Sequence, residues 1–186
     1  MSVTREKIME LGEELIVKRG YNAFSYQDIS SEMGIKNAAV HYYFPSKSSL
    51  GTSIVKNNIH RFEEMTDNMN IRELDDWQQL ESFLKIYLRS NREQKICLMG
   101  SLGPDFNTLP EPTQQELARM TGIVIDWLTD LLKRGRENGS FVFKGEPKDR
   151  ALVILSNMIG SLLLARILDR SDFKLIYHAI IDDLKA

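Results

Sequence analysis

Residues Phe24–Leu50 read FSYQDISSEMGIKNAAVHYYFPSKSSL, and this stretch decides the fold of the 186-residue chain. Ser25 and Asp28, three positions apart, are typical of a helix start, because their side chains can satisfy free backbone N–H groups there. Ile29 then begins an apolar face, and Gly34 supplies the permissive backbone that a tight turn between helices needs. The pattern predicts two short helices joined at Gly34.

The residues after this turn have side chains suited to reading DNA. In a helix-turn-helix, the N-terminal residues of the second helix face the base edges. Asn37 can pair with adenine through two hydrogen bonds, and Lys36 can reach guanine or a phosphate. Ala38 and Ala39 can contact the methyl group of thymine. We therefore expect the second helix to enter the major groove.

An aromatic cluster follows and ends at a proline. His41, Tyr42 and Tyr43 can donate hydrogen bonds to phosphates, while Pro45 ends the helix. Lys47 lies in the first turn of the next helix, where a cation opposes the helix dipole, so we expect it to bind an external phosphate. Each feature alone has a plainer explanation, since helix–glycine–helix turns are common and aromatic clusters at helical spacing mostly form cores. Their combination favours DNA binding.

These residues resemble the DNA-binding head of the TetR (tetracycline repressor) family of bacterial transcriptional regulators. The resemblance covers about residues 4–55 and runs through Gly34-Ile35, His41-Tyr42-Tyr43-Phe44, Ser46-Lys47 and Leu50. The candidate DNA contacts are Ser25, Tyr26, Gln27, Lys36, Asn37, Ala38, Ala39, His41, Tyr42, Tyr43 and Lys47. The family often has a small hydroxyl residue and a glycine early in the recognition helix, where this chain has Lys36-Asn37-Ala38. Its operator sequence therefore does not follow from better-known relatives.

Composition allows a sizeable core but does not by itself indicate a nucleic-acid partner. Hydrophobic residues make up 42% of the chain, and the lack of long Val/Thr-rich alternating stretches predicts an all-α fold. The net charge is −2, and residues 1–60 hold seven basic and six acidic residues, so the head is only weakly positive. The single cysteine excludes an internal disulfide and suits a reducing cytoplasm.

Breaks in the helical periodicity divide the chain. We expect a helix-turn-helix DNA-binding domain at residues 1–50 and a helical ligand-binding and dimerisation domain at residues 51–186. Besides the pair around Gly34, helices are expected at about 5–19, 45–70, 75–91, 113–138, 148–168 and 172–184. Gly100, Gly103 and Pro104 prevent a continuous helix over residues 94–109.

The most apolar run, 151–168, reaches the lower length limit of a membrane span. It contains Ser156, Asn157, Ser161 and Arg166, which favour a helix buried between subunits. The resemblance implies the same, because the last two helices of TetR-family proteins commonly form a four-helix dimer interface. The expected interface residues are Ile154, Leu155, Met158, Ile159, Leu162, Leu163, Ile176 and Ile180.

The body also resembles, less specifically, a TetR subgroup that includes electrophile-responsive repressors. The residues that carry this resemblance are His41–Lys47, Leu50-Gly51, Cys97-Leu98, Gly135-Arg136-Glu137-Asn138 and Gly145-Glu146-Pro147. Cys97 has two interpretations, a small apolar core residue or a partly exposed thiol sensor with a lowered pKa. The candidate ligand or sensor residues are Cys97, Phe106, Met120 and Trp127.

The sequence lacks the patterns of an enzyme, with no nucleophile elbow, phosphate loop or metal-spaced Cys/His cluster. Its three histidines have no evident catalytic partner at short spacing, so we expect no enzymatic activity, cofactor or metal. A helical adaptor that binds only protein is the alternative. The favoured hypothesis is an all-helical, homodimeric repressor in the cytoplasm, with no membrane partner. It would bind a double-stranded DNA operator and be released by an unknown small-molecule or thiol-reactive effector.

Overall fold

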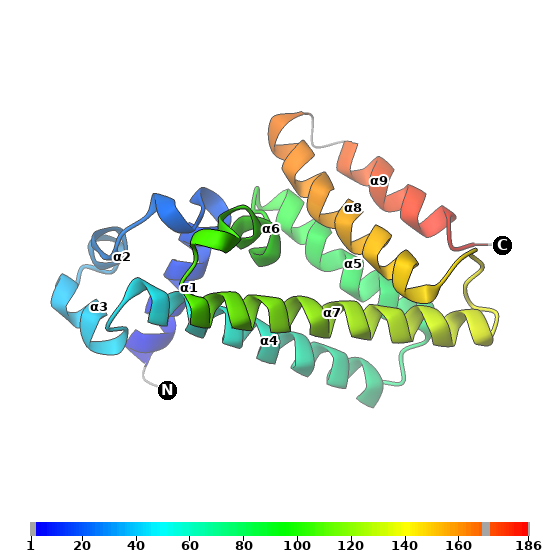
Figure 1. Ribbon diagram of the computed structural model, residues 1–186, viewed down its shortest axis with the longest axis horizontal. Coiled ribbons are helices and arrows are strands. Elements are labelled where there is room, and N and C mark those ends of the chain that lie inside the picture. Colours follow the sequence, from blue (N-terminus) through cyan, green and yellow to red (C-terminus); the bar gives the residue numbers. More distant parts are fainter. Residues whose placement is uncertain (1–2, 169–171, 186) are drawn as a thin grey trace. The chain divides into compact units, whose positions relative to one another are not determined.

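Figure 1 shows the computed structural model, which describes residues 3–168 and 172–185. The α-helices are α1 Val3–Arg19, α2 Tyr26–Met33, α3 Asn37–Tyr43, α4 Lys47–Ile71, α5 Asp76–Arg92, α6 Leu98–Leu102, α7 Glu111–Glu137, α8 Pro147–Ile167 and α9 Asp172–Asp182. Two 3₁₀ helices, η1 Tyr21–Ala23 and η2 Gly103–Thr108, complete the regular structure of the described residues. None of these residues lies in a strand, and the predicted all-α fold is confirmed.

Local chemistry sets most of the helix boundaries. Asp75 accepts a hydrogen bond from the backbone of Gln78 at 2.8 Å, and the Gln78 side chain accepts one from the Asp75 backbone at 3.0 Å. This reciprocal pair begins α5. Pro112 occupies the first turn of α7, where its missing N–H costs nothing. Past the other end of α7, Gly139 has a φ of 83°, which glycine adopts without strain. As expected, the 94–109 segment is broken, into α6 and η2.

The chain packs as two compact units, which we describe separately. The first comprises Met1–Arg61 and Leu98–Met120, and the second comprises Phe62–Cys97 and Thr121–Ala186. Both α4 and α7 contribute residues to each unit. The domain boundary at residue 50 stays a prediction.

In the first unit, α1 packs closely against the start of α4. Leu50 and Ile54 of α4 are buried, and a Cβ on Gly12 of α1 would lie 3.1 Å from a methyl group of each. The start of α7 is joined to α4 by a 2.9 Å hydrogen bond between the hydroxyls of Thr52 and Thr113. The same α1 also packs against α2, which packs in turn against α3.

In the second unit, α8 packs against α9 and α5, and Figure 1 shows α8 and α9 side by side. A buried carboxylate joins α5 to α7, since Asp76 accepts hydrogen bonds from Arg134 at 2.8 Å and from Asn138 at 2.6 Å. Burial alone would raise the pKa of Asp76, but the hydrogen bonds from Asn138 and Arg134, the charge of Arg134 and a hydrogen bond from Ser140 together lower it.

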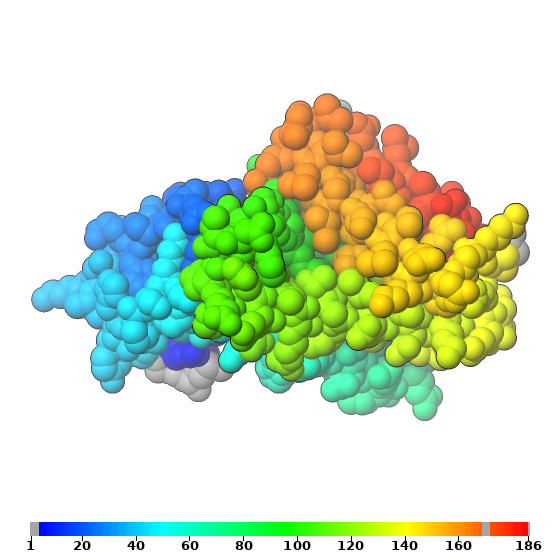
Figure 2. All heavy atoms as spheres, in the orientation of Figure 1, coloured from blue at the N-terminus to red at the C-terminus, as the bar shows by residue number. Residues whose placement is uncertain are grey.

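The burial along α8 and α9 corrects the expected dimer interface. Ile154, Leu155, Met158, Leu162 and Ile180 are at most 6% exposed within the single chain, because they pack inside the second unit. Ile159 and Ile176 are half-buried, and Leu163 is exposed. The exposed apolar residues on this part of the surface are instead Leu152, Val153, Leu163, Leu164, Ile167, Leu168 and Leu175. Side chains of α8, orange in Figure 2, form part of the visible surface.

Among the described helices, only α8 is long and apolar enough to cross a membrane by length and composition. Its buried face packs against α5 and α9, as in the core helix of a globular domain.

Candidate nucleic-acid interface

The turn between α2 and α3 has the conformation that the glycine predicted. Gly34 has a φ of 65° and a ψ of 30°, the left-handed region in which other residues are strained. The N–H of Ile35 then donates to the Ser30 carbonyl at 3.0 Å. At the start of α2, the Asp28 carboxylate accepts from the Ser25 N–H at 2.7 Å and from the Ser25 hydroxyl at 2.8 Å. These hydrogen bonds lower the pKa of Asp28, so the carboxylate stays charged.

Tyr26 supports α3 from inside and is not placed to contact DNA, which corrects the expectation from sequence. Its side chain is 7% exposed, and its hydroxyl donates to the Phe44 carbonyl at 3.0 Å. Its ring meets that of His41 at a centroid distance of 4.7 Å. Burial raises the pKa of Tyr26 to about 12, so the hydroxyl remains a donor. This contact fixes the end of α3 relative to α2.

Lys47 also supports the head from within, against the expectation that it binds a phosphate. Its ammonium lies 4.1 Å from the ring centroid of Phe24 and 4.9 Å from that of Tyr21. It also donates a hydrogen bond to the Phe24 carbonyl. Burial lowers the pKa of Lys47, as expected for an ammonium withdrawn from water. The motif identified an important lysine but not the direction in which it points.

A second cation has a similar supporting role that the sequence did not reveal. The Arg5 guanidinium lies 4.8 Å from the ring centroid of Phe44, itself only 1% exposed. Arginine at this place in α1 has no sequence signal of its own, because the partner ring lies 39 positions away.

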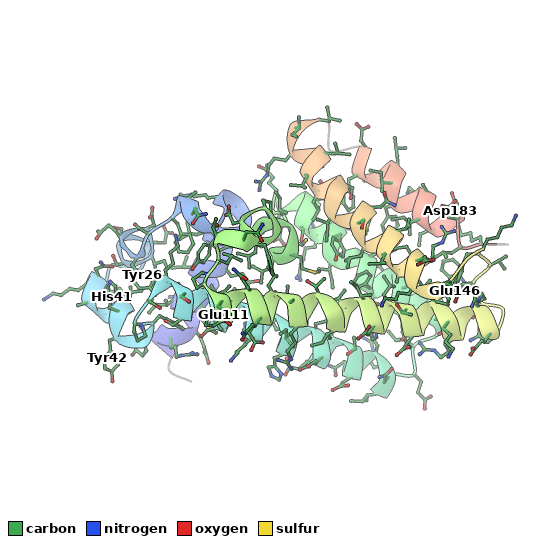
Figure 3. The ribbon with its side chains drawn as sticks, in the orientation of Figure 1. Tyr26, His41, Tyr42, Glu111, Glu146 and Asp183 are labelled. Atoms are coloured by element: carbon green, nitrogen blue, oxygen red, sulfur yellow. The ribbon has the colours of Figure 1, made fainter. Side chains whose placement is uncertain are left out.

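The exposed side of α3 carries most of the side chains that the sequence assigned to base or phosphate contacts. Lys36, Asn37, Ala38 and His41 are exposed, and Tyr42 is 81% exposed. Figure 3 shows Tyr42 pointing away from the helices around it, whereas Tyr26 lies between α2 and α3. A helix with such an exposed N-terminal half can present these groups to base edges in the major groove.

The remaining candidates lie at the edges of this surface. Ala39 and Tyr43 are half-buried, and the Tyr43 ring contacts that of Tyr42 at a centroid distance of 5.1 Å. Ser25 and Gln27 are exposed at the start of α2. The Gln27 amide donates to the hydroxyl of Ser31 at 3.1 Å, and Ser31 is an exposed polar residue that the sequence interpretation overlooked.

Comparisons with known proteins agree with this geometry. The family described as "Bacterial regulatory proteins, tetR family" matches residues 8–52, the part of the chain that holds α2 and α3. The crystal structure of a TetR transcriptional regulator from Legionella pneumophila is 33% identical, with a TM-score of 0.87. The match covers 100% of this chain and 99% of that one. This chain belongs to the TetR family of transcriptional regulators.

Other TetR-family proteins are also similar along most of their length. A TetR-family regulator from Agrobacterium tumefaciens has a TM-score of 0.91 and 28% identity, with 98% of both chains covered. The transcriptional repressor NemR of Escherichia coli (strain K12) is 26% identical over 168 residues, which are 88% of this chain and 84% of NemR. NemR supports the expected similarity to the subgroup of electrophile-responsive repressors.

The candidate sensor residues of this TetR-family chain do not belong to one unit. Cys97 and Trp127 lie in the second unit, while Phe106 and Met120 lie in the first. Cys97 is partly exposed just before α6. Burial and, to a smaller extent, an electrostatic interaction with Cys97 raise the pKa of the buried Tyr87. Within the described residues, no group of three or more His, Cys, Asp and Glu side chains could hold a metal ion.

Proposed function

We propose that this TetR-family protein represses transcription by binding, as a homodimer, to a near-palindromic operator. The observation that carries the proposal is the exposed N-terminal half of α3, with Lys36 and Asn37 at its start and His41 one turn later. Tyr26 holds this surface in place from the buried side, and Lys47 ties the start of α4 to the residues before α2. Side chains free to bind bases and a fixed helix beneath them are the two requirements of specific recognition.

A dimer supplies the second recognition helix. The exposed apolar side chains of α8 include Leu164 and Ile167, which are 48% and 79% exposed. A second copy of the chain would remove them from water through a two-fold interface. Such symmetry would place two α3 helices in successive major grooves, with half-sites about 34–36 Å apart.

An effector would then act by favouring a dimer geometry that no longer fits two grooves. This requires that the effector bind the two geometries with different affinities, because equal affinity shifts nothing. Cys97 is the candidate for covalent sensing, since it is the only cysteine and is partly exposed. The same response could come from a non-covalent ligand.

The DNA-binding part of the proposal is tested by replacing Asn37. Asn37→Ala should weaken binding to the operator by about 1–3 kcal/mol, because one bidentate base contact is lost, and should leave binding to random DNA unchanged. Asn70→Ala, an exposed asparagine near the end of α4, is the matched control. Fluorescence anisotropy with an inverted repeat from beside the protein's own gene measures both.

Equal losses on operator and random DNA would remove Asn37 from base reading. If the wild-type protein binds no promoter DNA, the alternative of a protein-binding adaptor is supported.

The sensing part of the proposal is tested on Cys97 alone. If its thiolate is the sensor, N-ethylmaleimide should release wild-type protein from the operator. Cys97→Ser should bind the operator as the wild type does and fail to respond. Unchanged DNA binding by the modified wild type would leave Cys97 as a packing residue.

A further inference from the structure

The second unit carries an open groove of about 1130 Å³ between the end of α4, one face of α5 and the start of α9. From α5 it is lined by Ser82, Lys85, Ile86 and Arg89, which follow the three- and four-residue spacing of one helix face. Lys174 of α9 lies at the same groove, 85 positions after Arg89. Three separate helices therefore contribute to one concave surface.

The interior of the groove is apolar. Its aliphatic and thioether side chains are Met65, Met69, Leu74, Ile86 and Leu88. Met69 is 4% exposed, whereas the other four remain partly accessible. Methionine side chains adapt to irregular shapes, and binding sites for small molecules are mostly lined by such apolar groups with a few polar ones.

The charged side chains around the groove all have one sign. They are Arg72, Lys85, Arg89, Arg92 and Lys174, and none of the described residues that line the groove is acidic. This is unusual in a chain with more acidic than basic residues. Gathered cations repel one another and create a positive potential that an anion would neutralise.

Most of these cations form no ion pair within residues 3–168 and 172–185. Lys85 pairs with Glu81 at 3.3 Å on the exposed surface, and the others form no ion pair with a described residue. The hydrogen bond from Lys95 and, to a smaller extent, Arg89 and Arg92 lower the pKa of Glu93. The Glu93 carboxylate itself bonds to Lys95 at 2.9 Å, which leaves the two arginines available to a ligand.

We propose that this groove binds a small amphipathic anion, a molecule with an apolar chain or ring system and a carboxylate, sulfate or phosphate head. The apolar part would cover Ile86 and Leu88, and the head would pair with Arg89 and Lys174. A purely polar anion would leave the apolar floor in water, and an uncharged lipid would leave the cations unpaired. This inference goes beyond the proposed repressor function, because it concerns binding alone and does not require that the ligand change DNA affinity.

The test uses sodium dodecanoate as the probe, below its micelle-forming concentration, with the full-length protein in a calorimeter. Arg89→Gln and Lys174→Gln should each weaken dodecanoate binding by threefold or more, and the double variant by tenfold or more. Lys133→Gln in α7 and Lys148→Gln in the first turn of α8 are matched controls, because both are exposed cations of the second unit outside the groove. Both controls should leave the affinity within twofold of the wild type.

Two further probes separate the contributions of head and chain. Dodecyltrimethylammonium, which has the same chain and a positive head, should not bind, and acetate should bind at least a hundredfold more weakly than dodecanoate. Circular dichroism at increasing temperature checks that every variant is folded.

Equal dodecanoate affinity for the groove variants and the controls would overturn the proposal. So would polyglutamate binding that dodecanoate does not displace, because it would assign the groove to an acidic protein segment. Operator binding by the same variants is measured separately. A negative result for the groove therefore does not contradict the proposed repressor function.

Discussion

Lys47 joins two aromatic rings and a backbone carbonyl in the first unit through one ammonium group. It lies at the start of α4 and contacts residues that precede α2, so it joins these two parts of the DNA-binding head. A support and a phosphate ligand respond differently to mutation, because only the phosphate ligand releases a counterion from DNA.

Lys47→Met should therefore lower stability without changing the salt dependence of DNA binding. Loss of the cation–π contacts and one hydrogen bond should reduce the free energy of unfolding by about 1–2 kcal/mol. The slope of log K against log salt should stay at the wild-type value, whereas Lys36→Gln, at the exposed start of α3, should reduce it by about one. Urea unfolding and DNA titrations at several salt concentrations measure the two effects. A reduced slope for Lys47→Met would return this residue to the DNA surface.

At the residue scale, the sequence predicted which residues are important better than it predicted where their side chains point. The turn at Gly34 could be predicted because its geometry depends on the residue itself and its near neighbours, whereas base reading by Asn37 stays a prediction. The inward orientation of Tyr26 could not be predicted, because it depends on the Phe44 carbonyl 18 positions away. Local pattern does not encode such long-range partners.

At the scale of one element, α7 contains two glycines with opposite surroundings. A Cβ on Gly135 would overlap the ring of Phe141, which is 1% exposed and lies 4.8 Å from the Trp77 ring by centroids. A Cβ on Gly122 in the same helix would meet nothing within 4 Å. The Gly135 position thus allows the chain after α7 to fold back onto the helix, where the Phe141 N–H donates to the Gly135 carbonyl at 2.9 Å.

The two alanine variants should change stability in opposite directions. Gly135→Ala should lower the free energy of unfolding by about 1–3 kcal/mol, because the added methyl group overpacks a filled site. Gly122→Ala should raise it by about 0.5–1 kcal/mol, because alanine loses less backbone entropy than glycine in a helix. Thermal unfolding followed by circular dichroism ranks the three proteins. Stabilisation by both variants would show that Phe141 moves aside without cost.

The positions of the helices along the chain were the most predictable feature of this molecule. Prolines, glycines and capping side chains mark helix ends through local rules, so α5 and α7 begin and end within two residues of their expected limits. The buried side of α8 was less accessible to prediction. The polar residues of α8 do not gather on one face, so they do not show which side packs against its own chain and which side is left for a partner.

At the scale of the whole molecule, the burial of one face of α8 limits which variants can test the proposed dimer. Leu162 is 3% exposed within its own chain. An arginine there would disrupt the core of the second unit, so its effect would reflect folding and not dimerisation. Ile167 and Ile71 form a better pair, because each is the last residue of its helix and they are 79% and 77% exposed.

Ile167→Glu should weaken dimerisation, while Ile71→Glu should not. A carboxylate in an apolar interface loses hydration without gaining a partner, and each 1.4 kcal/mol of that loss is a tenfold change in the dissociation constant. We expect a change of roughly tenfold or more for Ile167→Glu by sedimentation equilibrium, with a matching loss of operator binding although the DNA-binding head is untouched. The surface that includes Ile167 is a dimer interface only if Ile167→Glu weakens dimerisation and Ile71→Glu does not. A wild-type protein that sediments as a monomer at micromolar concentration would contradict the homodimer itself, and equal behaviour of the two variants would move the interface elsewhere.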